Sequence, residues 1–205
     1  MFISFEGIDF SGKSTQIELL KDYLTGKGCK VEIIREPGGT LISEKVRTIL
    51  LDKENSKMFW ESEFLLFSAS RAQLVREKIR PYLKQGFYVI SDRFHDSSTA
   101  YQGYGRGIPI QVIMNIHKLA IGDTLPDITF FIDIPVEVAH QRSIEKSSKN
   151  LDRMERSGDD FYNRVREGYL ELANNESRFR VIDGMEDINI IYKKIINEIV
   201  KFEQR

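Results

Sequence analysis

The residues near the start of the chain have the pattern of a phosphate-binding loop. Gly7-Ile8-Asp9-Phe10-Ser11-Gly12-Lys13-Ser14 fits G-x-x-x-x-G-K-[ST] at every fixed position, and Thr15 follows it. Glycines in such a loop let backbone N–H groups converge on phosphate oxygens, and the following helix adds the partial positive charge of its N-terminus. Lys13 can then reach the β- and γ-phosphates, and Ser14 can ligate Mg²⁺. The alternative is a chance match, expected on the order of once in a hundred chains of this length.

A second charged pair follows a predicted strand. Asp92 and Arg93 come directly after Val89-Ile90-Ser91, and in open α/β sheets the carboxyl ends of the strands form the ligand-binding edge. Asp92 could hold Mg²⁺ through water, and Arg93 could grip a phosphate with its planar fork. A structural Asp–Arg pair is the alternative, and the phosphate-binding loop nearby favours the functional interpretation.

Several residues could bind the molecule that accepts the phosphoryl group. Glu36, in the turn Arg35-Glu36-Pro37-Gly38-Gly39-Thr40, could accept a hydrogen bond from a hydroxyl, or could be a surface glutamate beside a turn. Arg47 could be a phosphate ligand or a solvated side chain. Phe67 and Arg71 are four residues apart on a predicted helix, so a base could stack on the ring while the guanidinium reads its edge. Core packing is the usual role of such a phenylalanine.

The segment from Phe94 to Gly107 combines glycines with hydroxyl and amide side chains. Its composition predicts a mobile, polar loop with many hydrogen-bonding groups. We assign no catalytic role to His95, because an acceptor phosphate is already ionised and its attack needs no base.

The elements that must position these residues alternate along the chain. Short apolar runs predict buried strands at 2–5, 31–34, 87–90, 128–132 and 179–182. Helices are predicted from Lys13 to about Gly26, at 60–83 with a break or kink at Pro81, at 110–121, from Pro135, at 160–173 and at 187–202. Strands alternating with helices indicate an α/β fold with a parallel sheet and helices on both faces. Residues 143–156 are polar and weakly periodic, and are expected to form a mobile surface flap.

Composition limits the class of protein. A chain of 205 residues with a formal net charge of -1 predicts one globular domain without a strong field for nucleic acid or acidic membrane. The single cysteine, Cys29, cannot form an internal disulfide, which fits a reducing cytoplasm. No apolar stretch is long enough to span a bilayer, and a signal peptide is not expected. GTPase motifs such as Asn-Lys-x-Asp are missing.

Six motifs in order give a specific resemblance. They are Phe-Glu-Gly-Ile-Asp-x-x-Gly-Lys-Ser-Thr, Arg-Glu-Pro-Gly-Gly-Thr, Leu-Phe-x-Ala-x-Arg, Asp-Arg-Phe-x-x-Ser-Ser-x-Ala-Tyr-Gln-Gly, Pro-Asp-Ile-Thr and Leu-Asp-Arg-Met-Glu, and they span Phe5 to about Tyr169. Together they resemble the bacterial thymidylate kinases. The resemblance implies a cytoplasmic homodimer with a P-loop NTPase fold and a five-stranded parallel sheet. It also implies the conversion of dTMP and ATP, with Mg²⁺, to dTDP and ADP, without nucleic-acid or membrane partners.

The resemblance also assigns roles by position. Asp9 and Glu36 resemble the acidic pair near the sugar 3′-hydroxyl and the acceptor phosphate, and Tyr101 resembles the ring under the deoxyribose. The other expected residues of the acceptor site are Pro37, Phe67, Arg71, Ser98 and Gln102 around the nucleoside, with Arg47 and Arg93 at the phosphate. The expected ATP-binding residues are Gly7, Ile8, Asp9, Phe10, Ser11, Gly12, Lys13, Ser14, Thr15 and Arg142, with residues 181–184 packed beside the adenine. Ser14 and Asp92 are the expected metal ligands.

Two positions depart from the family pattern. Phe10 stands where bacterial relatives usually have glycine and some others have arginine, so it adds no charge to the loop. Bacterial relatives supply arginines from a lid segment, expected here at about 142–160, where this chain carries Lys146 and Lys149. Arg153 is the first candidate for the catalytic lid cation, beside Asp9, Lys13 and Arg93 as catalytic residues; the alternative is that Arg153 only pairs with Asp152 or Glu155.

Two rival functions stay open at this stage. One is another nucleotide or nucleoside kinase, such as one acting on dCMP or deoxynucleosides. The other is a regulatory nucleotide-binding module that hydrolyses ATP slowly as a switch.

Overall fold

The computed structural model describes residues 1–145, 153–154 and 157–204. Within these residues five parallel strands form one sheet in the order β2-β3-β1-β4-β5. The strands are β1 (Phe2–Glu6), β2 (Val31–Arg35), β3 (Tyr88–Asp92), β4 (Ile128–Asp133) and β5 (Phe179–Asp183). Each predicted apolar run therefore matches a strand to within two residues at each end, and the predicted α/β fold with parallel pairing is confirmed.

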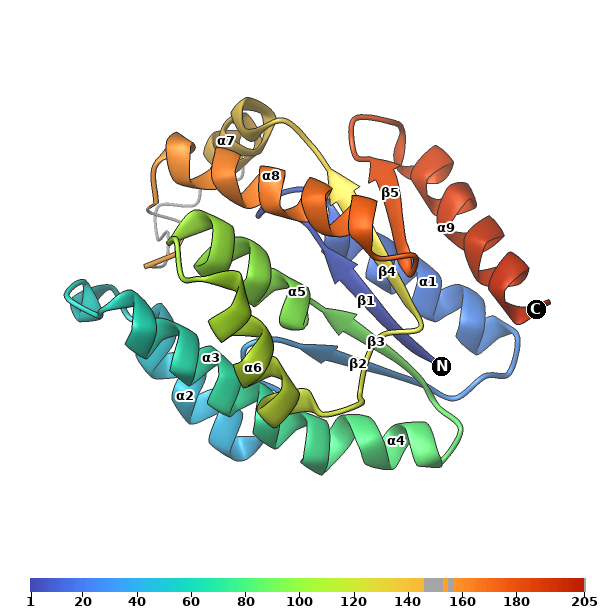
Figure 1. Ribbon diagram of the computed structural model, residues 1–205. Helices are drawn as coiled ribbons and strands as arrows, with labels where there is room; N and C mark the ends of the chain where they lie inside the picture. Colours follow the sequence, from blue (N-terminus) through green and yellow to red (C-terminus); the bar gives the residue numbers. More distant parts are fainter. Residues whose placement is uncertain (146–152, 155–156, 205) are drawn as a thin grey trace.

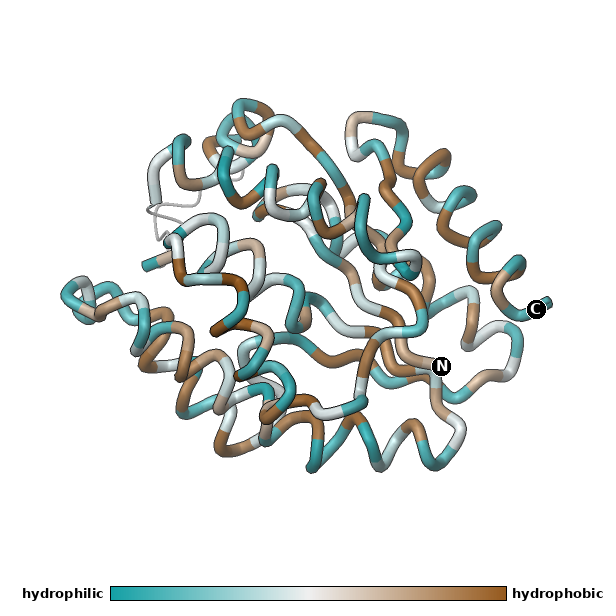
Figure 2. The backbone as a smooth tube through the Cα atoms, in the orientation of Figure 1, coloured by the Kyte–Doolittle hydropathy of each residue, from teal (hydrophilic) through white to brown (hydrophobic). Residues whose placement is uncertain are grey.

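Helices cover both faces of the sheet (Figure 1). Helices α1 (Lys13–Gly26) and α9 (Ile188–Glu203) pack together on one face. The remaining helices are α2 (Leu41–Leu51), α3 (Trp60–Leu74), α4 (Arg80–Lys84), α5 (His95–Ser98), α6 (Ile110–Ile121), α7 (Val136–Glu145) and α8 (Asp159–Asn175). Helix α9 shows why such segments are helical. Its buried residues Ile191, Ile195 and Ile199 recur at helical spacing and join the core cluster, and apolar (brown) and polar (teal) residues alternate along it in Figure 2.

The central strand β1 divides its side chains between two environments. Ile3 and Phe5 join the apolar cluster that α1 and α9 cover. Phe2 belongs to the cluster on the opposite face, which carries the helices around α3 and α6. Ser4 and Glu6 share that second face because side chains alternate along a strand, and both are fully buried polar groups.

The long helix predicted at 60–83 forms, with an irregularity directly before Pro81. Between α3 and α4 the chain widens into a π-helical stretch, η2 (Val75–Ile79), where Arg80 N–H donates to Val75 O, five residues back. Pro81 lies in the first turn of α4, where a missing N–H costs least. The break predicted at Pro81 therefore takes the form of a wider turn directly before the proline, a turn that contains Glu77, whose carbonyl group the proline ring would otherwise meet.

The segment 94–107 is not the mobile loop that its glycines predicted. It forms α5 and a π-helical stretch, η3 (Thr99–Gly105), and most of its side chains are buried. Gly105 packs directly on α8, because an added Cβ would lie 2.6 Å from the Phe161 ring. The glycines here allow close packing between helices, which composition alone cannot distinguish from loop flexibility.

The register of the strands brings the predicted site residues to one edge. Phe5 pairs with Asp92, and Arg35 also pairs with Asp92, so the carboxyl ends of β1, β2 and β3 are neighbours.

In the described part of the chain, no helix is both long and apolar enough to cross a membrane.

Candidate active site

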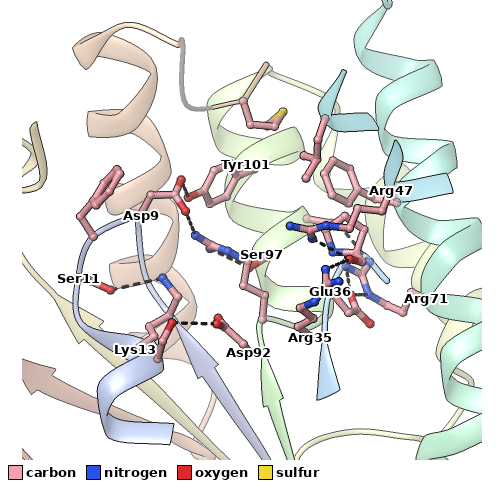
Figure 3. A pocket seen from close by; sticks show the side chains of 18 of the residues that line it. Asp9, Ser11, Lys13, Arg35, Glu36, Arg47, Arg71, Asp92, Ser97 and Tyr101 are labelled. Carbon is pink, nitrogen blue, oxygen red and sulfur yellow. Dashed lines mark hydrogen bonds and ion pairs between the residues drawn. The ribbon is translucent and has the colours of Figure 1, made fainter. Parts of the chain in front are cut away.

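A cavity of about 380 Å³ lies at this edge of the sheet (Figure 3). Most of the residues predicted for nucleotide and acceptor binding line it together. Its lining consists of Asp9, Phe10, Ser11, Gly12, Lys13, Ser14, Thr15, Arg35, Glu36, Pro37, Arg47, Leu51, Phe67, Arg71, Asp92, Arg93, Ser97, Ser98, Tyr101, Gln102 and Met154. The structure thus joins the phosphate-binding loop and the residues predicted to bind the acceptor, which lie up to 93 positions apart in the sequence (Asp9 to Gln102).

The loop between β1 and α1 has the backbone that phosphate binding requires. Gly7 has φ 137°, and a Cβ there would lie 2.5 Å from Ile132 O, so glycine is needed for both conformation and space. Helix α1 starts at Lys13, and no side chain among the described residues caps its first turn. Its N–H groups are therefore open to an anion in the cavity. Gly7 and Ile8 shape the loop from beneath and do not line the cavity.

Lys13 is held in the loop by neutral oxygens. Its Nζ donates to Gly7 O at 3.1 Å, to Ile8 O at 2.9 Å and to Ser11 Oγ at 3.4 Å. Burial lowers the pKa of Lys13 to about 8, and the nearby Arg93 guanidinium acts in the same direction. The ammonium is therefore poorly compensated until a phosphate arrives.

Asp9 and Arg93, which both line the cavity, form an ion pair. Arg93 donates to Asp9 Oδ1 at 2.7 Å and to Gly7 O at 2.8 Å, and its backbone has a left-handed φ of 70°. Burial would raise the pKa of Asp9, but Arg93 and Lys13 hold it below its usual value. Tyr162 and Tyr101 both direct a hydroxyl to Asp9 Oδ2, at 3.3 and 3.4 Å. Asp9 is therefore ionised and fixed in place.

Glu36 and Arg71 form a second, deeper ion pair. The Arg71 guanidinium lies 2.6 Å from Glu36 Oε2 and also donates to Ser98 Oγ at 3.0 Å and to Phe94 O at 3.1 Å. Arg71 is only 1% exposed. Glu36 Oε1 is buried but has no hydrogen-bond partner among the described residues, and burial raises the pKa of this carboxyl. This oxygen is an available acceptor for a hydroxyl on a bound molecule.

Two aromatic side chains and an arginine predicted to bind the acceptor also line the cavity. Phe67 is half-buried, so it both packs against an apolar cluster and lines the cavity. Tyr101 lies beneath the Arg93 guanidinium, which is 5.1 Å from its ring centroid. Arg47 donates to Pro37 O at 2.8 Å, which fixes the turn after β2 and keeps this cation at the cavity.

Ser14 and Asp92 are positioned for a hydrated cation. The Ser14 hydroxyl and Asp92 Oδ2 are 3.4 Å apart at the mouth of the loop. Among the described residues no group of three or more His, Cys, Asp or Glu side chains forms a metal cluster. Two oxygens beside a phosphate site nevertheless fit Mg²⁺, which usually keeps several waters and takes few protein ligands.

Besides Gly7 and Ile8, two predicted residues lie outside this cavity. Arg142 spans from Phe10 O to Gly184 O, at 3.3 and 3.2 Å, above the loop. Arg153 lines a neighbouring cavity of about 410 Å³, where it donates to Glu63 Oε2 at 2.6 Å and to Leu50 O at 2.8 Å. Its partner is thus Glu63; Asp152 and Glu155, the expected alternatives, lie outside the described residues, as do Lys146, Lys149 and Arg156.

Comparison with known proteins decides the family. The thymidylate kinase family model matches residues 5–195. The chain belongs to the thymidylate kinase family. It is 50% identical over 204 residues to a thymidylate kinase of Thermosipho africanus, covering 100% of both chains, and 50% identical to one of Kosmotoga olearia, covering 97% and 94%. A crystal structure of thymidylate kinase from Ehrlichia chaffeensis has a TM-score of 0.78 at 39% identity and covers 97% of each chain.

Membership of the thymidylate kinase family confirms the prediction made from the six ordered motifs. The structure adds site residues that the motifs did not single out. Arg35 and Ser97 line the cavity, and both lie inside motifs that point to the site. Tyr162 and Tyr169, seven residues apart on α8, contact Asp9 and Arg93. No local signal marks these two tyrosines except their shared helical face.

Proposed function

We propose that this chain transfers the γ-phosphoryl group of ATP to dTMP and releases ADP and dTDP, a step in dTTP synthesis. The observation that carries the proposal is that one cavity has the phosphate-binding loop at one side and the Phe67 and Arg71 side chains at the other. A donor bound at the loop and an acceptor bound at the other side would share this cavity, as direct in-line transfer requires.

The donor phosphates are expected at the start of α1. Backbone N–H groups of the loop and the Lys13 ammonium are expected to bind the triphosphate. Their interactions with the phosphate oxygens strengthen as negative charge develops on the transferring group. When bound by Ser14 and Asp92, Mg²⁺ supplies further charge neutralisation between the phosphates. Arg142, held against the loop by Phe10 O, is expected beside the adenine.

The acceptor is expected between Phe67 and Arg93. The Phe67 ring provides a stacking surface for a base, and Arg71 carries N–H groups toward its edge. Glu36 Oε1, which has no hydrogen-bond partner among the described residues, is expected to accept a hydrogen bond from the sugar hydroxyl. Arg93 and Arg47, both at the cavity, are expected to bind the phosphate of dTMP.

The lid cation stays a prediction. Arg153 is the first candidate, and in this structure its guanidinium is paired with Glu63. To meet the transferring phosphoryl group it would have to exchange that partner, so its test is the kinetic one given in the Discussion.

We also propose a cytoplasmic homodimer, as the family resemblance implies. Large apolar side chains are exposed on three adjacent helices, α2, α3 and α6, which include Ile42, Leu65 and Leu119 at 53%, 55% and 77% exposure. Patches of this kind typically mark protein–protein contacts. Sedimentation equilibrium at micromolar concentration tests it: a mass of one chain at all concentrations would contradict the dimer.

The test of the function is a coupled assay of ADP release. Wild-type protein is given ATP and Mg²⁺ with dTMP, dUMP, dCMP, AMP or thymidine in turn. We expect dTMP to be the best acceptor and Lys13→Ala to abolish turnover while the protein stays folded. Equal rates with dCMP would favour a broader nucleotide kinase, and ADP release that no acceptor accelerates would favour a regulatory ATPase.

A further inference from the structure

Glu63 is a buried carboxylate beside the proposed base-binding site. It is 1% exposed and lies on α3 one turn before Phe67, so both side chains share a helical face. Its Oε1 accepts from Gln102 Nε2 at 2.9 Å, and its Oε2 accepts from Arg153 at 2.6 Å. Arg106 approaches both oxygens at 3.4 Å. Glu63 itself does not line the main cavity.

These contacts fix the orientation of the Gln102 amide. An ionised carboxylate only accepts hydrogen bonds, so Gln102 must turn its NH₂ group to Glu63 and its carbonyl oxygen away from it. Gln102 lines the main cavity, and no residue in the described part of the chain donates to its carbonyl oxygen. Glu63 thereby makes Gln102 a hydrogen-bond acceptor toward the cavity.

This orientation matches one kind of pyrimidine. Arg71 can only donate, and the oriented Gln102 accepts, so the same cavity offers both a donor and an acceptor. The edge of a pyrimidine dione such as thymine presents a carbonyl oxygen next to an N–H, which complements this pair. Cytosine presents an amino group next to an unprotonated nitrogen, which places like groups opposite each other. A flipped Gln102 amide would remove half of this discrimination.

We propose that Glu63 is a positioning residue that sets acceptor selectivity by locking the Gln102 amide with its carbonyl oxygen toward the N–H of a pyrimidine dione. This inference rests on the proposed function, because it assumes dTMP as acceptor. Gln102 contacts the base, and Glu63 acts through it.

Glu63→Gln tests the proposal directly. The substituted side chain has one carbonyl oxygen, which Arg106 or Arg153 is expected to take because both donate to Glu63 Oε2. Its NH₂ group then faces Gln102 and forces that amide to flip. We expect the ratio of kcat/KM for dTMP to that for dCMP to fall by about tenfold or more, with the KM for ATP unchanged. Weakened contacts of Arg106 and Arg153 affect both acceptors alike, so the ratio isolates the amide. Glu61→Gln, an exposed position on the same helix, is the matched control and should leave the ratio unchanged.

A second measurement does not depend on how the variant folds. In wild-type protein with bound dTMP, ¹⁵N-edited NOE spectra should connect the Gln102 side-chain NH₂ protons to the Glu63 methylenes. Contacts from those protons to the thymine ring instead, or an unchanged dTMP:dCMP ratio in folded Glu63→Gln, would overturn the role of Glu63. A wild-type protein inactive on dTMP would instead refute the proposed function.

Discussion

Lys13 is expected to gain a proton when ATP binds. Among the described residues its ammonium donates hydrogen bonds to the neutral oxygens Gly7 O, Ile8 O and Ser11 Oγ, and burial lowers its pKa to about 8. Phosphate oxygens beside Lys13 favour the charged form, so in the complex its pKa should return to about 10 or above. Binding therefore draws in a proton wherever free Lys13 is neutral.

The size of the effect follows from the two pKa values. With a free pKa of about 8, proton uptake per ATP is about 0.1 at pH 7, about 0.5 at pH 8 and about 0.9 at pH 9. A group whose pKa rises on binding weakens the affinity as pH rises through its free value. The dissociation constant for ATP should therefore increase about tenfold between pH 7 and pH 9. Glu6, whose pKa burial raises to about 7, is already mostly ionised at pH 8 and above.

Calorimetry measures this uptake. ATP is titrated at pH 8 and pH 9 in two buffers of different ionisation enthalpy, and the slope of apparent enthalpy against ionisation enthalpy gives the protons exchanged. Lys13→Arg keeps a permanent charge and should show no uptake in this range. Wild-type binding that exchanges no protons at pH 9, with an affinity independent of pH, would refute the argument that Lys13 is poorly compensated in the free protein.

Three further changes have defined outcomes. Arg71→Ala leaves the buried Glu36 carboxylate unpaired, so it should lower the free energy of unfolding in urea by about 3–5 kcal/mol and weaken dTMP binding while sparing ATP; an equally stable variant would contradict the pair's role. Gly105→Ala forces a methyl group against Phe161 and should cost about 1–3 kcal/mol by the same measurement, whereas an unchanged midpoint would mean that this packing is loose. Arg153→Ala should lower kcat at least about tenfold with unchanged dissociation constants, and a smaller loss would leave Arg153 as a partner of Glu63 only.

Short-range patterns predicted the fold because its elements are locally encoded. The apolar runs of the strands and the amphipathic spacing of α9 appear within windows of a few residues. The segment 94–107 was mistaken for a loop because a high glycine content is found both in flexible loops and in helices that pack closely. What decides between them is contact with Phe161, more than fifty residues away in the sequence.

The candidate site likewise contains residues that sequence motifs could place and residues that they could not. Lys13, Glu36 and Arg93 could be placed from motifs, because each follows a strand that ends at the ligand-binding edge. Glu63 carries no such mark: on its helix it looks like an ordinary charged residue near the N-terminus. Its importance arises from Gln102 and Arg153, 39 and 90 positions away, and spacing along a chain does not show which side chains will meet.

The Arg71–Glu36 pair has a consequence for the chemistry of inhibitors. Arg71 is already held by Glu36, Ser98 and Phe94 O before any ligand is present. A neutral head group with a carbonyl oxygen would meet a preorganised donor and avoid the cost of ordering an arginine side chain, about 2 kcal/mol. An acidic head group would gain little, because the same guanidinium is already neutralised and the Glu36 carboxylate beside it would repel the added charge. Uncharged, dione-like compounds are therefore the scaffolds that this pocket should favour.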